Sequence, residues 1–315
     1  MPPATPSFDP GLTQKYTGPL LRAINKDGSF NIRRRGLRGL GGSIYMHLVN
    51  LSWPKFWGLV ALAYLVVNTV FAAMYTMLGT RALRAAETDM GLGAFGKAFF
   101  FSVHTLTTVG YGDLYPLGFA ANVVASAEAA VGLMGFALAT GLLFARFSRP
   151  NARLVFSDRM VVAPYGDGHS LQFRMANRRT NVLTDVLVDM MLMTVEQNAE
   201  GQLRRNFVEL KLERKKIFFL ALTWTVVHVI DESSPLKGMK AADLERVQAE
   251  VLILIRGYDD SFTQVVNTRY SYRWEEIEWS ARFAPAFDVS PAGHLVLDVD
   301  RISATSAVAN LAGNA

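Results

Sequence analysis

The 315-residue sequence contains no cysteine, which excludes a disulfide framework, a thiolate metal site and a cysteine nucleophile. It also lacks a Ser-His-Asp pattern, a phosphate-binding glycine loop and a nucleic-acid-binding motif. The segment from Met1 to Arg38 is polar, without the basic start, apolar core and small-residue cleavage site of a signal peptide. These absences argue against an enzyme or a nucleic-acid-binding protein, and they predict a cytoplasmic N-terminus.

Charged residues make up only 19% of the chain, whereas hydrophobic residues make up 50%. This balance is too apolar for one soluble domain and too charged for a bundle of many membrane helices, so it predicts a membrane part and an aqueous part. The formal net charge is +5, and much of the positive charge lies beside apolar segments. An anionic membrane surface is therefore the expected partner of this charge, rather than nucleic acid.

Two stretches, residues 54–78 and 117–147, are long and apolar enough to cross a bilayer. The first has no charge after Lys55. The second contains one carboxylate, Glu128, and exceeds one bilayer thickness, which suits a tilted helix that protrudes into the cytoplasm. Basic residues are concentrated before the first span and after the second, so the positive-inside rule places both termini in the cytoplasm.

The segment between the spans, residues 79–116, is then external. Its apolar middle, AFGKAFFFSVHTLTT, is too short to span the membrane and is expected to re-enter it. Before the first span, residues 43–53 alternate apolar and polar side chains at helical spacing and end in Trp53. This pattern favours a helix lying on the inner leaflet, although the first turn of the span would also explain it.

From Arg153 onward the sequence changes to short alternating runs divided by turn residues, as at Gly166-Asp167-Gly168. We expect further strands, and one short helix near residues 241–249. The expected strands lie around residues 184–195, 203–212, 218–229, 251–255 and 262–272. A two-sheet sandwich best accommodates them.

The expected fold class is therefore an α + β membrane protein with two transmembrane helices, a re-entrant helix and a cytoplasmic two-sheet β-sandwich. The predicted domains are a cytoplasmic N-terminal segment, 1–42; a pore domain, 43–150, with an interfacial helix at 43–53, spans at 54–78 and 117–147 and a pore helix and filter at 94–112; a β-sandwich domain, 151–300; and a C-terminal tail, 301–315.

The re-entrant segment ends in the octad TLTTVGYG, residues 105–112, and Thr-Val-Gly-Tyr-Gly is the established selectivity-filter sequence of potassium channels. A dehydrated potassium ion needs a cage of oxygens, which four copies of an extended strand can supply from backbone carbonyls. The carbonyls expected to bind K⁺ are those of Thr108, Val109, Gly110 and Tyr111, with the Thr108 hydroxyl completing the innermost site. Gly110 and Gly112 allow torsions that side chains disfavour. Gly-Tyr-Gly alone occurs in ordinary turns, but irregular backbone between two spans is tolerated only around a water-filled path.

Several separated segments make the chain resemble the prokaryotic inward-rectifier potassium channels, the KirBac family of the potassium channel superfamily. They are the filter, GLLFARFSRP at 141–150, FRMANR at 173–178 and VHVIDESSPL at 227–236. The resemblance covers about residues 30–300. It implies a homotetramer in a bacterial inner membrane that conducts K⁺ passively, without a cofactor. It also implies that the re-entrant helix is a pore helix and that the cytoplasmic β-sandwich is immunoglobulin-like and extends the pore.

His228, Asp231 and Glu232 could otherwise suggest a metal or acid/base site, because histidine with nearby carboxylates is a common catalytic grouping. The resemblance implies a structural loop instead.

Phe136, Thr140 and Phe144 recur at four-residue spacing in the second span and could line the pore cavity. Phe144 resembles the family's gate at the inner helix bundle, where converging rings would exclude water. Gly141 removes side-chain bulk where the helix must bend or approach a neighbour. Ordinary helix packing is the alternative for all of these residues.

Three arginines, Arg146, Arg149 and Arg153, follow the second span. The resemblance implies that they bind anionic phospholipids or phosphoinositides, whose headgroups attract basic side chains. The positive-inside rule alone would also place them there.

Asp185 and Asp260 resemble acidic rings of the family's cytoplasmic pore, although surface carboxylates are mostly only solvated. Phe136 stands where strongly rectifying relatives carry an acidic residue, so polyamine or Mg²⁺ blockers are expected to bind weakly. His104 stands where many inward rectifiers carry a glutamate behind the filter.

Two other functions remain compatible with the sequence. A membrane-anchored adaptor would carry a vestigial pore, but it would not need an intact octad. A poorly selective cation channel would result if His104 loosens the filter. No span has arginines at every third position, so gating by voltage alone is not expected.

Overall fold

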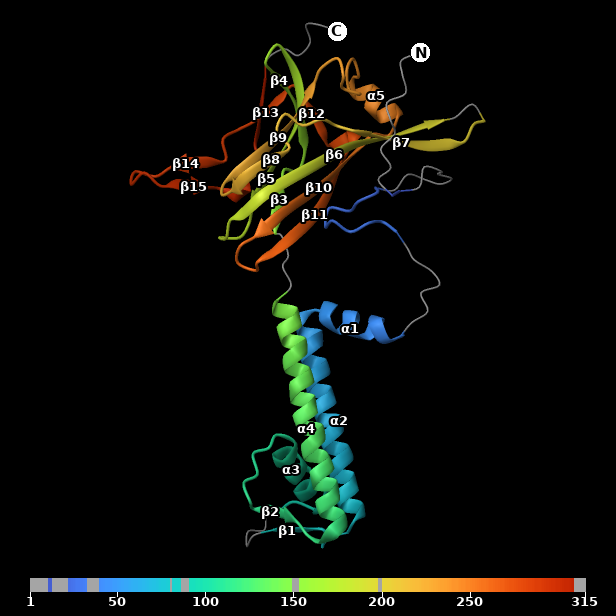
Figure 1. Ribbon diagram of the computed structural model, residues 1–315, viewed down its shortest axis with the longest axis vertical. Helices are drawn as coiled ribbons and strands as arrows, with labels where there is room; N and C mark the ends of the chain where they lie inside the picture. The colour runs from blue at the N-terminus through green and yellow to red at the C-terminus, as the bar shows by residue number, and fades with distance from the viewer. Residues whose placement is uncertain are drawn as a thin grey trace. The chain divides into compact units, whose positions relative to one another are not determined.

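The computed structural model describes residues 11–12, 22–32, 40–79, 81–85, 91–148, 153–197 and 200–308. The chain divides into two compact units, residues 36–149 and residues 1–35 together with 150–315. Figure 1 shows the first unit as helical and the second as rich in strands.

The helical unit contains two long apolar helices, α2 (Trp53–Met77) and α4 (Gly118–Phe147), of 25 and 30 residues. Both could cross a bilayer, as the sequence predicted. A shorter helix, α1 (Leu40–Asn50), ends before α2 begins, and Pro54 occupies the first turn of α2. Proline is tolerated there because the first backbone N–H groups of a helix have no intrahelical partner.

Between the two long helices lies α3 (Ala94–Leu106), which packs against both of them. Two short strands, β1 (Leu83–Ala85) and β2 (Leu114–Pro116), pair antiparallel and flank α3 and the loop that follows it. Helix α3 and the octad at residues 105–112 lie in the chain between these two strands.

The strand-rich unit contains two five-stranded sheets. In the first, the order is β11-β10-β6-β7, with β8 also paired to β6; in the second, it is β12-β4-β5-β3, with β9 also paired to β5. The bounds of the first sheet are β6 (Leu183–Gln197), β7 (Leu203–Glu209), β8 (Lys216–Leu220), β10 (Glu250–Asp259) and β11 (Gln264–Arg273). Those of the second are β3 (Leu154–Phe156), β4 (Met160–Tyr165), β5 (Gly168–Asn177), β9 (Thr223–Ile230) and β12 (Ile277–Trp279).

Fully buried side chains of both sheets, among them Phe173 of β5 and Tyr272 of β11, belong to one hydrophobic core. Alternating inward residues of paired strands produce such a core in a β-sandwich. The predicted sandwich and the predicted turn between β4 and β5 are therefore confirmed.

The single strand predicted over residues 218–229 is wrong. The chain turns at Ala221-Leu222, so β8 pairs in one sheet and β9 in the other. Neither turn residue is a glycine, proline or asparagine, and for this reason the sequence carried no breaker signal.

Smaller elements complete the unit: α5 (Ala241–Arg246), β13 (Ala281–Phe283), β14 (Phe287–Val289), β15 (Leu295–Leu297) and β16 (Thr305–Ala307), with single turns at Trp274–Glu276 and Val299–Arg301. Strand β16 pairs with β13, so regular structure continues beyond residue 300.

The N-terminal segment from Arg22 to Ile32 packs on the sandwich. The buried carboxylate of Glu250 accepts hydrogen bonds from the backbone N–H groups of Ala23 and Ile24. Arg22 forms an ion pair with Glu276. Burial opposes the ionisation of Glu276, but hydrogen bonds from Arg22 and Lys26 outweigh it and hold the pKa of this carboxyl below its ordinary value.

Candidate functional site

The filter segment begins where α3 ends. After the cap residue Thr107, the backbone N–H of Val109 donates to the carbonyl of His104 (2.9 Å). Positive φ values then recur at every second residue, Thr108 (60°), Gly110 (56°) and Gly112 (85°). In an ordinary strand successive residues point to opposite sides, so an alternation between left-handed and extended torsions is needed to aim successive carbonyls the same way.

In the isolated chain the filter is open to its surroundings: Val109 is 50% and Tyr111 is 70% exposed. The imidazole of His104 contacts the Tyr111 ring edge to face, with ring centroids 4.8 Å apart. His104 therefore contacts the filter through its carbonyl and through its ring. The sequence alone did not predict the contact with the Tyr111 ring.

Helices α3 and α4 make a close contact at the end of α3, just before the predicted filter segment. A Cβ atom built on Gly132 would lie 2.2 Å from the carbonyl oxygen of Leu106, so only glycine fits at this position. One turn earlier on α4, the buried Glu128 hydrogen-bonds to Tyr75 of α2 and to Ser102 of α3. Sequence reasoning missed this polar cluster, although the lone carboxylate in an apolar span was visible.

Phe136, Thr140 and Phe144 lie along α4 at successive turns, and the two phenylalanines are each 73% exposed in the isolated chain. Thr140 is exposed as well. A methyl group added at Gly141 would meet no described atom within 4 Å, in contrast to one added at Gly132. These side chains are thus available to face either neighbouring subunits or a cavity.

The side chain of Arg146 contacts the end of α1 and the start of α2, which belong to the same unit. Its guanidinium donates to the carbonyls of Leu48 (2.8 Å), Val49 (3.1 Å) and Leu51 (2.7 Å), at the end of α1. The same group lies 4.6 Å from the ring centroid of Trp53. Arg146 therefore caps α1, because the last carbonyls of a helix have no intrahelical donor.

The two other arginines predicted to bind lipid are Arg149 and Arg153. Arg153 is exposed. Arg149 lies outside the described residues.

The two carboxylates predicted for the cytoplasmic pore lie near one another, because β6 and β10 pair through Thr184 and Tyr258. Asp260 accepts a hydrogen bond from the Thr184 hydroxyl (3.4 Å). Asp185 is exposed and forms an ion pair with Lys216 (2.9 Å), which offsets its charge.

His228 is buried and neutral. Its Nδ1 lies 2.7 Å from the Lys211 carbonyl, to which it must donate, so Nε2 accepts from the Ser234 hydroxyl (2.8 Å). Burial lowers the pKa of His228 below its ordinary value. Asp231 accepts instead from the backbone and hydroxyl of Ser233, and Glu232 pairs with Lys237. Among the described residues, no three His, Asp or Glu side chains form a metal-binding group.

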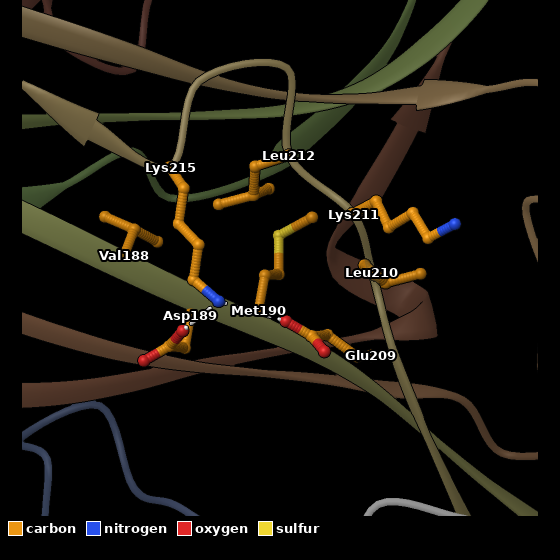
Figure 2. A pocket seen from close by; sticks show the side chains of 8 residues that line it. All are labelled: Val188, Asp189, Met190, Glu209, Leu210, Lys211, Leu212 and Lys215. Atoms are coloured by element: carbon orange, nitrogen blue, oxygen red, sulfur yellow. Dashed lines mark hydrogen bonds and ion pairs between the residues drawn. The ribbon is translucent and has the colours of Figure 1, made fainter. Parts of the chain in front are cut away.

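Figure 2 shows a cavity of about 280 Å³ beside β6 and the segment that connects β7 to β8. Lys215 at its rim forms ion pairs with Asp189 (2.8 Å) and Glu209 (3.1 Å). The hydrogen bonds to both carboxylates raise the pKa of Lys215. These three charges therefore pair with one another at the rim of the cavity.

Two apolar helices that enclose a short helix and a loop with repeated left-handed residues define a pore-loop membrane protein. A family model described as an ion channel matches residues 59–149, and one described as the inward rectifier potassium channel C-terminal domain matches residues 154–314.

Individual relatives agree with these matches. The inward rectifier potassium channel Kirbac3.1 of Paramagnetospirillum magnetotacticum is 38% identical over 282 residues, which cover 89% of this chain and 94% of the relative. The ATP-sensitive inward rectifier potassium channel 10 of Mus musculus is 27% identical, with 98% and 85% covered. The G protein-activated inward rectifier potassium channel 3 of Mus musculus is 27% identical, with 83% and 72% covered.

The chain belongs to the inward rectifier potassium channel family. It is an integral membrane protein, and its relatives are ion channels rather than enzymes. The resemblance drawn from the sequence motifs is confirmed.

Proposed function

We propose that four copies of this chain surround one pore that conducts K⁺ passively and selectively, with the filter formed by Thr108, Val109, Gly110, Tyr111 and Gly112. The observation that carries this proposal is the alternation of positive φ values along the octad, in a loop between two apolar helices. Rings of backbone carbonyls from four such loops can replace the hydration shell of the ion. No bound cofactor is required.

The proposed orientation has both termini in the cytoplasm of a bacterium, with the protein in its inner membrane. The charge asymmetry around α2 and α4 supports it.

Gating is assigned to the inner helix bundle. Phe144 and Phe136 present exposed rings two turns apart on α4 with Thr140 between them, and Gly141 leaves the backbone free to bend. A hydrophobic constriction gates by excluding water. Anionic phospholipids or phosphoinositides at Arg149 and Arg153 would bias this gate, whereas a lipid at Arg146 would compete with three carbonyls.

Block by polyamines or Mg²⁺ is proposed to be weak. The Phe136 ring carries no charge, and the ion pair with Lys216 offsets the charge of Asp185. Asp260 remains as a contributor to the cytoplasmic pore. Exposed charges farther than a Debye length of about 8 Å from a blocker are largely screened.

The experiment that tests this function compares K⁺ and Na⁺ flux into liposomes containing the purified protein. Gly110→Ala should abolish selective K⁺ flux, because alanine disfavours the left-handed torsion by roughly 1–2 kcal/mol in each of four subunits. Gly58→Ala is the matched control, since a methyl group there has no neighbour within 4 Å. Unchanged K⁺-over-Na⁺ selectivity in Gly110→Ala would remove the filter assignment.

A further inference from the structure

Glu128 is the eleventh of the 30 residues of α4 and is fully buried among three helices. Asn68 of α2 and Ser102 of α3 beside it are also fully buried, and Tyr75 of α2 is 1% exposed. The proposed gate, filter and lipid contacts make no use of this cluster. An ionisable side chain inside a membrane-spanning helix is costly, so its partners decide what it can do.

The cluster contains three hydrogen-bond contacts, and only two hydroxyl groups, those of Tyr75 and Ser102, take part in them. Tyr75 Oη lies 2.7 Å from one carboxyl oxygen of Glu128, and Ser102 Oγ is hydrogen-bonded to the other. The same Ser102 Oγ lies 3.0 Å from Asn68 Oδ1. Each contact requires one hydrogen, whereas each hydroxyl carries only one.

The orientation of the Asn68 amide is fixed by a further contact. Its Nδ2 donates to the backbone carbonyl of Tyr64 (2.8 Å), and the flipped amide would place two acceptors against each other. Asn68 Oδ1 can therefore only accept, so Ser102 must donate its single hydrogen to Asn68. The hydrogen between Ser102 and Glu128 must then come from the carboxyl group.

The surroundings agree with a carboxyl group that keeps its proton. Within the part of the chain that the structure describes, both hydrogen-bond partners of Glu128 are hydroxyls rather than basic side chains. The titratable groups on the two packed helices are Lys55, Tyr64 and Tyr75 on α2 and Lys97 and His104 on α3. The His104 ring contacts Tyr111 rather than the carboxyl. A buried carboxylate without a cation partner would be strongly disfavoured.

We propose that Glu128 is a neutral carboxylic acid that donates to Ser102, accepts from Tyr75 and thereby positions the pore helix α3 beneath the filter. This inference rests on the proposed function and adds a positioning residue to it. Ser102 and Leu106 lie one turn apart on α3, and Glu128 and Gly132 lie one turn apart on α4.

The hydrogen bond between Ser102 and Glu128 and the close contact between Leu106 and Gly132 therefore lie along one line of contact between α3 and α4. We call this line the seam between α3 and α4. Leu106 is two residues before Thr108. Any shift of α4 along this seam is transmitted to the first carbonyl of the filter.

The test is Glu128→Gln, compared with Glu128→Ala in the full-length protein. A carboxamide places an N–H donor and a carbonyl acceptor in nearly the same positions as a neutral acid, so K⁺ flux, selectivity and the pH profile of flux should match those of the wild type. Glu128→Ala should lower flux by about tenfold or more, because the hydroxyls of Tyr75 and Ser102 lose their partner. A Gln variant as inactive as the Ala variant would show that a charged carboxylate is needed, and would overturn the proposal.

Infrared spectroscopy gives a readout that does not depend on conduction. The wild type minus Glu128→Gln difference spectrum at neutral pH should contain the C=O stretching band of a protonated carboxyl group. A carboxylate band in its place would overturn the inference even if the channel conducts normally. If instead the band is present and the protein conducts no K⁺, the proposed pore fails while the proton assignment stands.

Discussion

Thr108 adopts φ = 60°, a left-handed conformation that β-branched residues rarely take. Strain of this kind, of order 1–3 kcal/mol, persists only where the surrounding structure fixes it, and it is concentrated at functional sites. Here the constraint comes from the C-terminus of α3, where the N–H of Thr108 donates to Thr105 (3.1 Å) and that of Val109 to His104. The filter backbone is thus held from one end by the helix that precedes it.

Two glycines of α4, Gly132 and Gly135, differ in the space available for a side chain. Gly132→Ala forces a methyl group against the Leu106 carbonyl and should cost about 1–3 kcal/mol, the range of overpacked sites, with loss of selective flux. Gly135→Ala meets no atom within 4 Å and should leave flux and the midpoint of thermal unfolding nearly unchanged. Equal behaviour of the two variants in flux and unfolding assays would contradict the seam between α3 and α4.

His228 makes the stability of the strand-rich unit depend on pH. Its pKa is lower in the folded state than in the unfolded chain, so the unfolded chain binds more protons over the interval between the two values. The contribution to stability is complete above about pH 6.5, the ordinary histidine pKa, and is lost as the pH falls toward the folded value.

Thermal unfolding between about pH 5 and pH 8 measures this effect. The midpoint of the wild type should fall as the pH drops below about 6.5, and the slope should be smaller in His228→Asn. A slope that His228→Asn leaves intact would assign the pH dependence to other groups.

At the scale of elements, the side chain of Arg146 joins α4 to the end of α1. The guanidinium of Arg146 bridges the last carbonyls of α1 and stacks beside Trp53 and Phe56. A bidentate, planar group is needed for these contacts, and lysine cannot reproduce them.

Arg146→Gln should therefore weaken the protein even in neutral lipid, by about 1–3 kcal/mol for hydrogen bonds from a charged donor. Arg153→Gln should leave stability unchanged and reduce only the response of flux to phosphoinositides. Unfolding in detergent and a lipid titration in liposomes separate the two roles. If both variants lose the lipid response and neither loses stability, the capping role of Arg146 is wrong.

The proposed gate residue, Phe144, also lies on α4. Phe144→Ala should raise basal K⁺ flux, because smaller side chains at a constriction no longer exclude water. Phe119→Ala is the matched control at the opposite end of the same helix, where the ring is 88% exposed. Wild-type flux in Phe144→Ala would count against a gate at this residue.

At the scale of the whole molecule, most of the apolar surface of the two long helices is not covered by the described part of the chain. In the most apolar 18-residue window of each helix, only 17% of the residues of α2 and 6% of those of α4 are buried. Lipid and further copies of the chain are the surroundings that can cover such a surface. The proposed assembly of four copies would cover part of this surface.

How much the sequence could predict depends on whether a feature is local. The lengths of α2 and α4 follow from continuous apolar runs, and the turn between β4 and β5 follows from two glycines. The change of sheet between β8 and β9 has no breaker residue, so no local pattern indicates where the chain turns.

The same distinction holds for the candidate site, in which a local motif was predictable and contacts between distant residues were not. The octad is enough to propose the filter, because the chemistry of a carbonyl filter resides in the backbone of consecutive residues. The cluster around Glu128 joins Ser102, 26 residues away, and Tyr75, 53 residues away. Arg146 meets carbonyls 95 to 98 residues away. Contacts over such separations are set by how the helices pack, which periodicity alone does not determine.

The reversal potential with K⁺ on one side of a planar bilayer and Na⁺ on the other tests the central proposal most directly. A filter built from the carbonyls of Thr108 to Tyr111 predicts a reversal potential displaced far toward the K⁺ equilibrium potential, and a loss of this displacement in Gly110→Ala. A reversal potential near zero in the wild type, with measurable current, would contradict a potassium-selective pore.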